Sequence, residues 1–345
     1  MEYNLALIGF GNVGLGLAEI LSKKASLLRE KFAADIRIVA ICDLAKGSIA
    51  DPVGFDPRVL LDHLEKKGDL KEFPASDKGW DAIETIENSS ANVLVELSFT
   101  DLETGEPALS YMIRALELGM HVSTTNKGPA ALHFPELLEL SKTHGGAIGV
   151  EGTVMSGTPT LALGMNMLSA AGVTRIQGIL NGTTNYILGQ MENGVDYADA
   201  LQDAQAKGYA EADPSGDVDG FDAAAKVVIL ANLAMGQNMT MKDVYRIGIS
   251  GLTVAQIQSA RLANQRWKLI ATLENVNGRI QGSVKPVKLD ASHPLYGIGG
   301  AANGVTYSTD LLGDITLIGP GAGRIETGYA IIGDILSFQR CSRHE

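Results

Sequence analysis

The sequence is poor in cysteine and has no long apolar run. Its 345 residues include only two cysteines, Cys42 and Cys341, which lie far apart and lack the spacing of metal ligands. This excludes a disulfide framework and a zinc site, and it favours a reducing compartment such as the cytoplasm. No uncharged apolar run of about 18 residues is present to span a membrane, and no basic, cleavable leader opens the chain. We therefore expect a cytoplasmic protein without a membrane partner.

The chain also lacks the basic clusters that bind nucleic acid. It has 28 Lys and Arg against 40 Asp and Glu, for a formal net charge of −12. Neutralising phosphates requires gathered lysine and arginine side chains, so a nucleic-acid partner is not expected. The remaining composition, 45% hydrophobic and 20% charged, is that of a globular protein long enough for two domains. A small molecule is the expected partner.

A glycine-rich turn follows the first predicted strand. An apolar run over residues 3–8 leads into "GFGNVG" and then into a helical pattern from 13 to 32. In this context the pattern predicts a dinucleotide site, since Gly9 permits the turn, Gly11 lets the backbone approach a pyrophosphate, and Gly14 allows close helix packing. Free N–H groups at the helix N-terminus favour the anion. The predicted cofactor residues of this segment are Gly9, Phe10, Gly11, Asn12, Val13 and Gly14.

The second predicted strand, "IRIVAICD", ends in an acidic residue that bears on the cofactor. Asp43 at this position is suited to hydrogen-bond the ribose diol of NAD. Lys46, three residues later, is suited to meet the 2′-phosphate of NADP. The sequence therefore predicts NAD or NADP and leaves the choice open.

Strands and helices alternate up to about residue 130. The strand-like segments "NVLVELSFT" and "MHVSTTNKGPAA" flank a helical pattern over 105–119. Such alternation predicts a Rossmann-like, parallel, doubly wound sheet, whose ligands bind at the carboxyl ends of its strands. Ser98, Thr100, Asn126 and Lys127 stand at those ends, and we expect them beside the cofactor. For Lys127 alone, a solvated loop lysine is an equally good interpretation.

The remainder of the chain predicts a second α/β domain. It contains a helix over 131–144, the strand and helix of "RIQGILNGTTNYILGQM", and later segments of strand and hairpin character. The last thirty residues repeat the order strand, glycine turn, helix, and we expect them to return to the first domain. The predicted domains are therefore 1–130 with 311–345, which binds NAD(P), and 131–310, a substrate-binding and catalytic domain with a mixed sheet.

An acidic segment, "GYAEADPSGDVDGFDAAAK", runs into an apolar helix at residues 208–226. Helix capping by Asp217 or Asp219 explains one or two of its carboxylates. It does not explain Asp222 and Lys226, which lie four apart on an apolar stripe, where an exposed ion pair adds only about 0.3–0.5 kcal/mol. If the stripe faces a cleft, Glu211 or Asp222 holds a polar substrate and Lys226 protonates an alkoxide. A dehydrogenase that uses a lysine and no metal in catalysis fits these residues.

Taken together, the motifs make the chain similar to the homoserine dehydrogenase family over essentially its whole length. "GFGNVG", "STTNKGPAA", "EGTVMSGTP", "ILNGTTNYIL", "GYAEADPSGDVDGFDAAAK" and "GPGAG" occur in the family's order. The resemblance implies NAD(P)-dependent interconversion of L-homoserine and L-aspartate 4-semialdehyde, a step toward threonine, methionine and isoleucine. It also implies a homodimer formed through the second domain's sheet. Because the sequence stops after its last helix, a monofunctional enzyme without the C-terminal regulatory domain is expected.

The resemblance also implies roles for individual residues. Glu211 and Asp222 would bind polar groups of the substrate, with Asp217 nearby, and Lys226 would donate or accept the proton. By the same resemblance, Lys127 would be a second cationic group, and Gly208 and Gly323 would lie near the cofactor. A monovalent cation, usually sodium, would be held by Glu151 and the carbonyls of Val154, Ser156 and Thr158. Asp213 and Asp219 are left as loop and capping residues.

Three positions depart from the family's pattern. Thr125 stands where alanine is commoner, Ser98 where threonine is usual, and "VMSG" where "VGAG" is commoner in the cation loop. Two other interpretations remain: a related dehydrogenase acting on another small aldehyde, and a nucleotide-binding regulator that has lost its chemistry. The intact set of carboxylates with Lys226 argues against the regulator.

Overall fold

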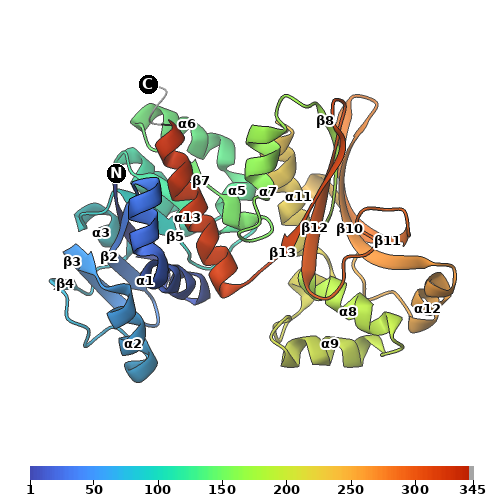
Figure 1. Cartoon of the computed structure of the whole chain (residues 1–345), viewed down its shortest axis with the longest axis horizontal. Helices are drawn as coiled ribbons and strands as arrows, with labels where there is room; N and C mark the ends of the chain where they lie inside the picture. Colours follow the sequence, from blue (N-terminus) through green and yellow to red (C-terminus); the bar gives the residue numbers. More distant parts are fainter. Residues whose placement is uncertain (342–345) are drawn as a thin grey trace. The chain divides into compact units, whose positions relative to one another are not determined.

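The computed structural model describes residues 1–341 and divides the chain into two compact units (Figure 1). One unit is Met1–Gly157 with Gly323–Glu345, and the other is Thr158–Ala322. Each unit contains one sheet, with seven strands in the first and six in the second. The predicted fold class, a Rossmann-like domain with a second α/β domain, is confirmed. Residues 342–345, which the predicted nucleotide-binding domain includes, and the side chains of Arg340 and Cys341 lie outside the described part.

The sheet of the first unit has the order β4-β3-β2-β1-β5-β6-β7. Its strands are β1 Glu2–Ile8, β2 Asp35–Asp43, β3 Gly47–Phe55, β4 Asp77–Lys78, β5 Val93–Glu96, β6 His121–Thr124 and β7 Ile148–Gly149. Its helices are α1 Asn12–Phe32, α2 Pro57–Lys67, α3 Ala82–Asn88, α4 Ala108–Glu117, α5 Lys127–Leu132, α6 Phe134–His144, the 3₁₀ turn Glu151–Thr153 and α13 Arg324–Cys341. Successive residues of β1 and β5 pack into two different apolar clusters, so both faces of the sheet are buried.

One edge of this sheet departs from the predicted parallel arrangement. Strands β1, β2, β5, β6 and β7 pair in parallel, whereas β3 pairs antiparallel with β2 and with β4. Only residues 44–46 connect β2 to β3. A connection this short can form a hairpin but cannot form the crossover that a parallel pair requires. The expectation of a wholly parallel sheet was therefore wrong at this edge.

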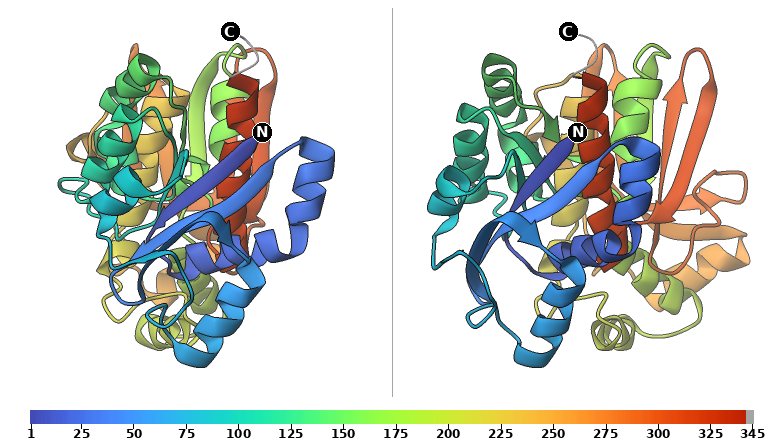
Figure 2. Two further views of the ribbon diagram at one scale, coloured as in Figure 1. Left: turned by 90° about the vertical axis from the view of Figure 1, so that its left-hand side faces the viewer. Right: turned by 60° about the vertical axis from the view of Figure 1, so that its left-hand side comes forward.

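The C-terminal helix α13 packs against α1 in the first unit, and the two helices lie side by side in both views of Figure 2. Glycines make this approach close. A Cβ atom at Gly16 would overlap the carbonyl of Arg324, and one at Gly328 would lie 2.6 Å from the amide nitrogen of Leu17. The last helix is therefore part of the core that supports the glycine-rich turn.

The sheet of the second unit has the order β13-β12-β8-β10-β11-β9. The sheet is mixed, because β9 and β11 pair in parallel whereas all the other neighbouring strands of the sheet pair antiparallel. Its strands are β8 Val173–Ile179, β9 Val244–Arg246, β10 Gln265–Val276, β11 Arg279–Asp290, β12 Ala302–Thr309 and β13 Gly313–Pro320. Its helices are α7 Thr160–Ala162, the π-helical turn Leu163–Met167, α8 Gly182–Glu192, α9 Tyr197–Ala206, α10 Ser215–Val218, α11 Phe221–Ala234, the 3₁₀ turn Met241–Asp243 and α12 Val254–Leu262. Across the described residues, none of the helices has the length and apolar character needed to cross a membrane.

Candidate active site

The glycine-rich turn joins β1 to α1 as predicted. Gly9 has a φ of 92°, and a Cβ atom there would lie 2.5 Å from the carbonyl oxygen of Leu97, so no larger residue fits. Gly11 is the N-cap of α1, has no side-chain cap, and offers open space, because a Cβ atom there would meet nothing within 4 Å. A 21-residue helix thus begins at an open, uncapped N-terminus. This end suits a pyrophosphate.

Asp43 stands at the end of β2 and holds this turn in place. Its Oδ2 accepts the N–H of Phe10 at 2.7 Å, and its Oδ1 accepts the N–H groups of Lys46 at 2.8 Å and Ala45 at 3.0 Å. Burial opposes ionisation, but these donors outweigh it and hold the pKa of Asp43 below its ordinary value. A fixed negative charge therefore lies beside the glycine-rich turn.

The carboxyl ends of β5 and β6 meet around a buried carboxylate that the sequence analysis missed. Glu96 accepts the N–H of Ser98 at 2.8 Å and the hydroxyl of Thr124 at 3.0 Å, and it also bonds the Ser98 hydroxyl. Asn126 donates to the carbonyl of Phe99 at 2.9 Å and caps α5. The structure thus brings Ser98 and Asn126 together at the ends of β5 and β6.

Two other residues predicted at this edge lie differently. Thr100 is exposed. Lys127 is half-buried and begins α5, so it is not the solvated loop lysine of the alternative interpretation. The helix forms there because the Asn126 side chain accepts the N–H of Gly128 at 3.0 Å.

Glu96 predicts a pH-dependent stability. Burial raises the pKa of its carboxyl, so the folded state keeps the proton to higher pH than the unfolded state, and the free energy of unfolding falls as pH rises from the ordinary glutamate pKa to the raised one. Glu96→Gln removes this titration. Urea unfolding between pH 5 and 9 should show the variant gaining stability relative to the wild type as pH rises. Glu65→Gln, at an exposed position on α2, should show a constant difference, and a constant difference for Glu96→Gln would contradict the interpretation.

The loop predicted to hold a cation follows β7. Glu151 opens the 3₁₀ turn, and the next residues include Met155 at φ 58° and Ser156 at φ 56°. Both lie in the left-handed region that favours glycine, and each position costs on the order of 1 kcal/mol or more. The Ser156 hydroxyl bonds that of Thr327 at 2.8 Å, while Thr158 begins the second compact unit. Among the described side chains, no group of three or more His, Cys, Asp or Glu is placed to hold a metal ion, so a cation at this loop would rely on Glu151 and carbonyl oxygens.

The second unit contains the ion pair that the acidic segment predicted. Lys226 Nζ lies 2.8 Å from Asp222 Oδ2, one turn earlier on α11, and it donates to the carbonyl oxygen of Leu180 at 2.6 Å. Lys226 is only 6% exposed. The helix around it is buried on nearly all sides because its alanines, valines and leucines leave no polar face. An ammonium held in such surroundings is costly unless it is paired.

An amide joins this pair to another carboxylate. Asn181, the N-cap of α8, donates through Nδ2 to Asp217 Oδ1 at 2.6 Å and to Asp222 Oδ2 at 3.0 Å. Its Oδ1 accepts the N–H of Thr184 at 2.9 Å and so caps the first turn of α8. Burial raises the pKa of Asp217, and the charge of Asp222 adds to the effect. No sequence pattern indicated that Asn181 bridges two carboxylates.

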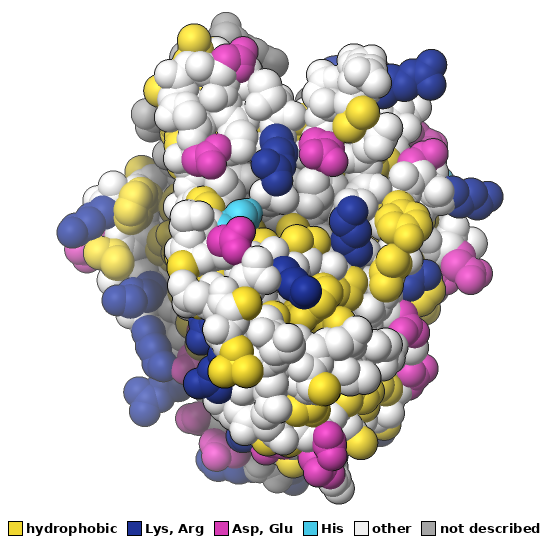
Figure 3. Space-filling model, turned by 90° about the vertical axis from the view of Figure 1, so that its right-hand side faces the viewer, with side chains coloured by type: hydrophobic (Ala, Val, Ile, Leu, Met, Phe, Trp, Pro, Cys, Tyr) yellow, Lys and Arg dark blue, Asp and Glu magenta, His cyan; other side chains and the backbone are white. Residues whose placement is uncertain are grey.

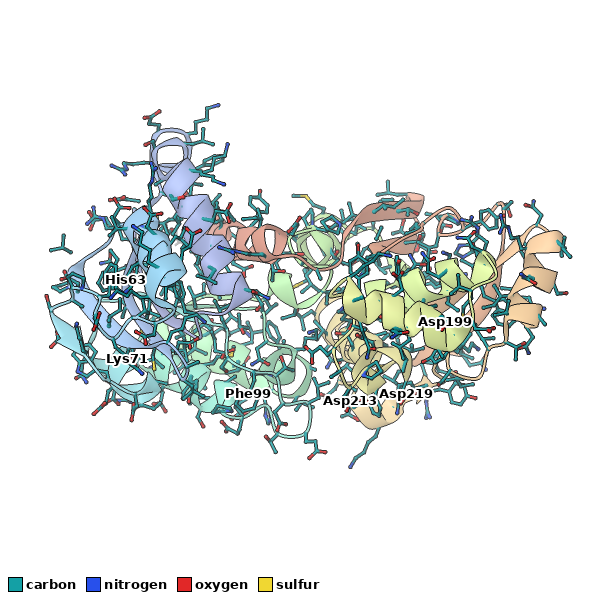
Figure 4. The ribbon with its side chains drawn as sticks, turned by 90° about the horizontal axis from the view of Figure 1, so that it is seen from below. His63, Lys71, Phe99, Asp199, Asp213 and Asp219 are labelled. Carbon is teal, nitrogen blue, oxygen red and sulfur yellow. The ribbon has the colours of Figure 1, made fainter. Side chains whose placement is uncertain are left out.

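The other acidic residues of the segment separate from this cluster. Glu211 is exposed. Its backbone carbonyl accepts a hydrogen bond from Gln205 Nε2 at 2.9 Å. Asp213 accepts the N–H of Ser215 at 3.0 Å, as a loop residue does. The prediction that Asp219 caps α11 was wrong, because Gly220, at φ 80°, is the N-cap. Figure 4 labels Asp213 and Asp219 on the stretch between α9 and α11.

The last two predicted cofactor glycines both have positive φ. Gly208, just after α9, has a φ of 74°, and Gly323, just before α13, has a φ of 146°. Gly208 is exposed, and a Cβ atom there would meet nothing within 4 Å. A Cβ atom at Gly323 would lie 2.1 Å from Oε2 of Glu326, so that side chain would have to move. Both positions therefore need glycine for backbone reasons, whatever they bind.

Chemically, the cluster of Asn181, Asp217, Asp222 and Lys226 combines a proton donor with hydrogen-bond acceptors. The ammonium of Lys226 has three donors, and Leu180 and Asp222 use two of them. The carboxyl groups of Asp217 and Asp222 offer oxygen acceptors beyond those that Asn181 and Lys226 occupy. The cluster can therefore hold a cationic or hydroxyl-bearing substrate and exchange a proton with it.

Comparison with known proteins identifies the family. The model of the homoserine dehydrogenase family matches residues 159–336. The NAD(+)-dependent homoserine dehydrogenase of Pseudomonas canavaninivorans is 43% identical over 97% of this chain and 96% of its own, and the homoserine dehydrogenase of Methanocaldococcus jannaschii is 37% identical over 96% and 97%. A solved hyperthermophilic archaeal homoserine dehydrogenase in complex with NADPH matches with a TM-score of 0.83, at 31% identity over 99% of this chain and 98% of that one. The chain therefore belongs to the homoserine dehydrogenase family, whose members are NAD(P)-dependent oxidoreductases that act on a CH–OH group.

Proposed function

We propose that this protein interconverts L-homoserine and L-aspartate 4-semialdehyde with NAD(P), in the synthesis of threonine, methionine and isoleucine. The observation that carries the proposal is the buried Lys226–Asp222 pair, bridged by Asn181 to Asp217. Two further observations support the proposal: the relatives are named homoserine dehydrogenases, and one similar solved structure, of an archaeal homoserine dehydrogenase, contains NADPH. In this proposal the first compact unit binds the cofactor and the second binds the substrate.

Lys226 is the proposed acid and base. In the oxidation of homoserine, the neutral amine takes the hydroxyl proton, and in the reverse direction the ammonium returns it to the carbonyl oxygen. NAD(P), held at the glycine-rich turn after β1, would supply the acceptor for the hydride of the carbinol carbon. Asp222 and Asp217 hold the substrate's polar groups, with Glu211 completing the set from its exposed segment. Lys127 adds a second positive charge.

We propose that NAD is the preferred cofactor. The pKa of Asp43 lies below its ordinary value, with burial opposing and N–H donors favouring its ionised form, so the end of β2 is anionic at neutral pH. A carboxylate at this position accepts hydrogen bonds from a ribose diol and repels a 2′-phosphate. The NAD(+)-dependent relative at 43% identity supports the same preference.

A steady-state assay tests both statements. Purified protein given L-homoserine at alkaline pH should reduce the cofactor, seen as the absorbance of the reduced nicotinamide, with a higher kcat/KM for NAD⁺ than for NADP⁺. Other small hydroxy amino acids, such as L-serine and L-threonine, serve as substrate controls. Reduction of neither cofactor with homoserine would refute the proposed activity, and a higher kcat/KM with NADP⁺ would refute the cofactor preference.

Gly11→Ala separates ligand binding from folding. The added methyl group meets no atom within 4 Å, and the φ of −78° is ordinary for alanine, so the variant should fold as the wild type does. The methyl group would stand where the pyrophosphate approaches the backbone, so we expect the Kd for NAD⁺ to rise on the order of tenfold or more. Gly189→Ala in α8, where an added Cβ also meets nothing, is the matched control and should leave the Kd unchanged. Equal Kd values for Gly11→Ala and wild type, measured by fluorescence titration, would contradict a pyrophosphate at this turn.

We also propose a monovalent cation at the loop after β7. Its ligands would be the Glu151 carboxylate and the carbonyls of Val154, Ser156 and Thr158, and such oxygen donors suit a hard cation. The left-handed backbone at Met155 and Ser156 supports the proposal, because strained conformations of this kind concentrate at binding sites. The bound ion would orient the loop and take no part in proton transfer.

A homodimer formed through the second unit's sheet completes the proposal. Alternate residues of this sheet form a polar ladder, in which Thr306 bonds Thr316 at 2.8 Å and Gln177 donates to Thr272 at 3.4 Å. Ile318, on edge strand β13, is 56% exposed. Figure 3 looks at the side of the molecule that carries β11 and shows hydrophobic side chains gathered between lysine and arginine side chains. A reducing cytoplasm is proposed as the compartment, consistent with the free thiol of Cys42.

A further inference from the structure

A second buried lysine lies in the same unit and takes no part in the proposed chemistry. Lys268, on β10, is 1% exposed, and Nζ donates to Asn185 Oδ1 at 2.8 Å and to the carbonyl oxygen of Ile298 at 2.6 Å. Neither acceptor is charged. Burial lowers the pKa of Lys268 to about 8. The charge of the buried Glu192 favours the ammonium, but Glu192 is not among the hydrogen-bond partners of Lys268. A buried ammonium hydrogen-bonded only to neutral acceptors is unfavourable for stability, so its presence calls for another role.

The partner of Lys268 ties a glycine-rich loop to helix α8. Asn185 donates through Nδ2 to the carbonyls of Ala302 at 3.1 Å and Ile298 at 3.4 Å. Lys268 and Asn185 therefore hold both ends of the segment 298–302. The segment lies flush on the start of the helix, because a Cβ atom at Gly182 would come within 2.5 Å of the Ala301 carbonyl oxygen.

This contact ends one residue from the candidate site. Gly182 follows Asn181, whose side chain bonds both Asp217 and Asp222. Asn185 is also one turn from Asn181 on α8, and its N–H donates to the Asn181 carbonyl at 3.3 Å. A continuous set of contacts thus runs from Lys268 through Asn185 and the 298–302 segment to Asn181 and then to the carboxylates. If the first turn of α8 shifts, the amide that separates and orients the two carboxylates shifts with it.

We propose that Lys268 is a positioning residue for the dehydrogenase site, acting through Asn185 and the 298–302 segment to hold Asn181 against Asp217 and Asp222. The inference rests on the proposed function, because Asp217 and Asp222 matter to turnover only if they bind the substrate. Lys268 itself touches neither substrate nor cofactor. The proposal predicts that replacing Lys268 changes activity only as long as Asn181 is present.

A double-mutant cycle tests this dependence. Lys268→Met, which keeps the length of the apolar stem, should lower kcat/KM for L-homoserine roughly tenfold while leaving the Kd for NAD⁺ unchanged. In the Asn181→Ala background the same substitution should lower kcat/KM by less than about twofold, because the connection is already lost. A merely structural role of Lys268 would lower the urea midpoint, but it would not make the effect of Lys268→Met on kcat/KM depend on Asn181. Independent effects on kcat/KM would overturn the proposal.

Two further variants keep the test decisive. Lys288→Met, at an exposed position on β11 whose ammonium lies 5.3 Å from the Trp267 ring centroid, is the matched control and should keep wild-type kcat/KM. If Lys268→Met does not fold, Asn185→Asp replaces it. The new carboxylate still accepts from Lys268 but cannot donate to Ile298 and Ala302, so kcat/KM should again fall roughly tenfold, and wild-type activity would overturn the proposal. If the wild type does not oxidise homoserine, the proposed function fails first, whereas an active wild type with additive variants refutes only the role of Lys268.

Discussion

Replacing Lys226 by methionine should lower kcat for homoserine oxidation by a factor on the order of 10²–10⁴, the usual contribution of a positioned acid or base. The substitution keeps most of the apolar stem of the side chain within α11, so the helix can still pack. It removes the ammonium group that donates hydrogen bonds to Asp222 and to the Leu180 carbonyl. The Kd for NAD⁺ should stay within about twofold, because the glycine-rich turn belongs to the other compact unit.

Lys242→Met supplies the control for this experiment. Lys242 lies in the 3₁₀ turn Met241–Asp243 of the same unit and takes no part in the candidate site. Its kcat should equal that of the wild type. Single-turnover measurements on both variants would separate the chemical step from product release. A Lys226→Met enzyme with wild-type turnover would remove Lys226 from the proposed mechanism.

Asp222→Ala should be the most destabilising change within the cluster. It leaves the Lys226 ammonium buried without its carboxylate, and breaking a buried pair in this way costs about 3–5 kcal/mol. Because the Asp222 side chain is 23% exposed, we expect a value near the lower end, about 3 kcal/mol. Turnover should fall as well, since Asp222 is a proposed substrate ligand. Urea unfolding and steady-state kinetics measure the two effects separately.

The double variant Asp222→Leu with Lys226→Met should regain stability relative to Asp222→Ala while remaining inactive. Two apolar side chains of similar size pack well on a helix that is already apolar on nearly all sides, so most of the stability lost in Asp222→Ala should return. Activity should not return. If the double variant were as unstable as Asp222→Ala, the pair would not be the source of the destabilisation.

The sequence predicted most of the fold because local patterns decided it. The apolar run of β1, the glycines after it and the helical pattern of α1 together specify one arrangement. The antiparallel β3 was missed because its segment, "GSIADPVGF", carries a proline and an aspartate and does not resemble a buried strand. The N-cap of α11 was predicted wrongly because aspartate is a commoner N-cap than glycine, and two aspartates stand close to the helix start. The structure uses Gly220 instead, in a left-handed conformation that the sequence pattern did not indicate.

The candidate site was predictable only where its residues share one element. Asp222 and Lys226 are four apart on a helix, so their contact follows from helical geometry. Leu180 and Asn181 reach the pair from the junction of β8 and α8, and their contacts depend on how these elements pack against α11. Buried polar groups such as Glu96 were missed for the same reason, because burial of a single glutamate is a tertiary property that strand patterning does not encode.

The central claim is that the cluster of Asn181, Asp217, Asp222 and Lys226 is the substrate site. A crystal structure with NAD⁺ and L-homoserine bound to the Lys226→Met variant, which should bind both and turn over slowly, tests this most directly. The account predicts that the amino group of homoserine is bound by carboxylates of the Glu211, Asp217 and Asp222 set, and that its hydroxyl points toward position 226. Homoserine bound away from these residues, or with its hydroxyl directed away from position 226, would contradict the account.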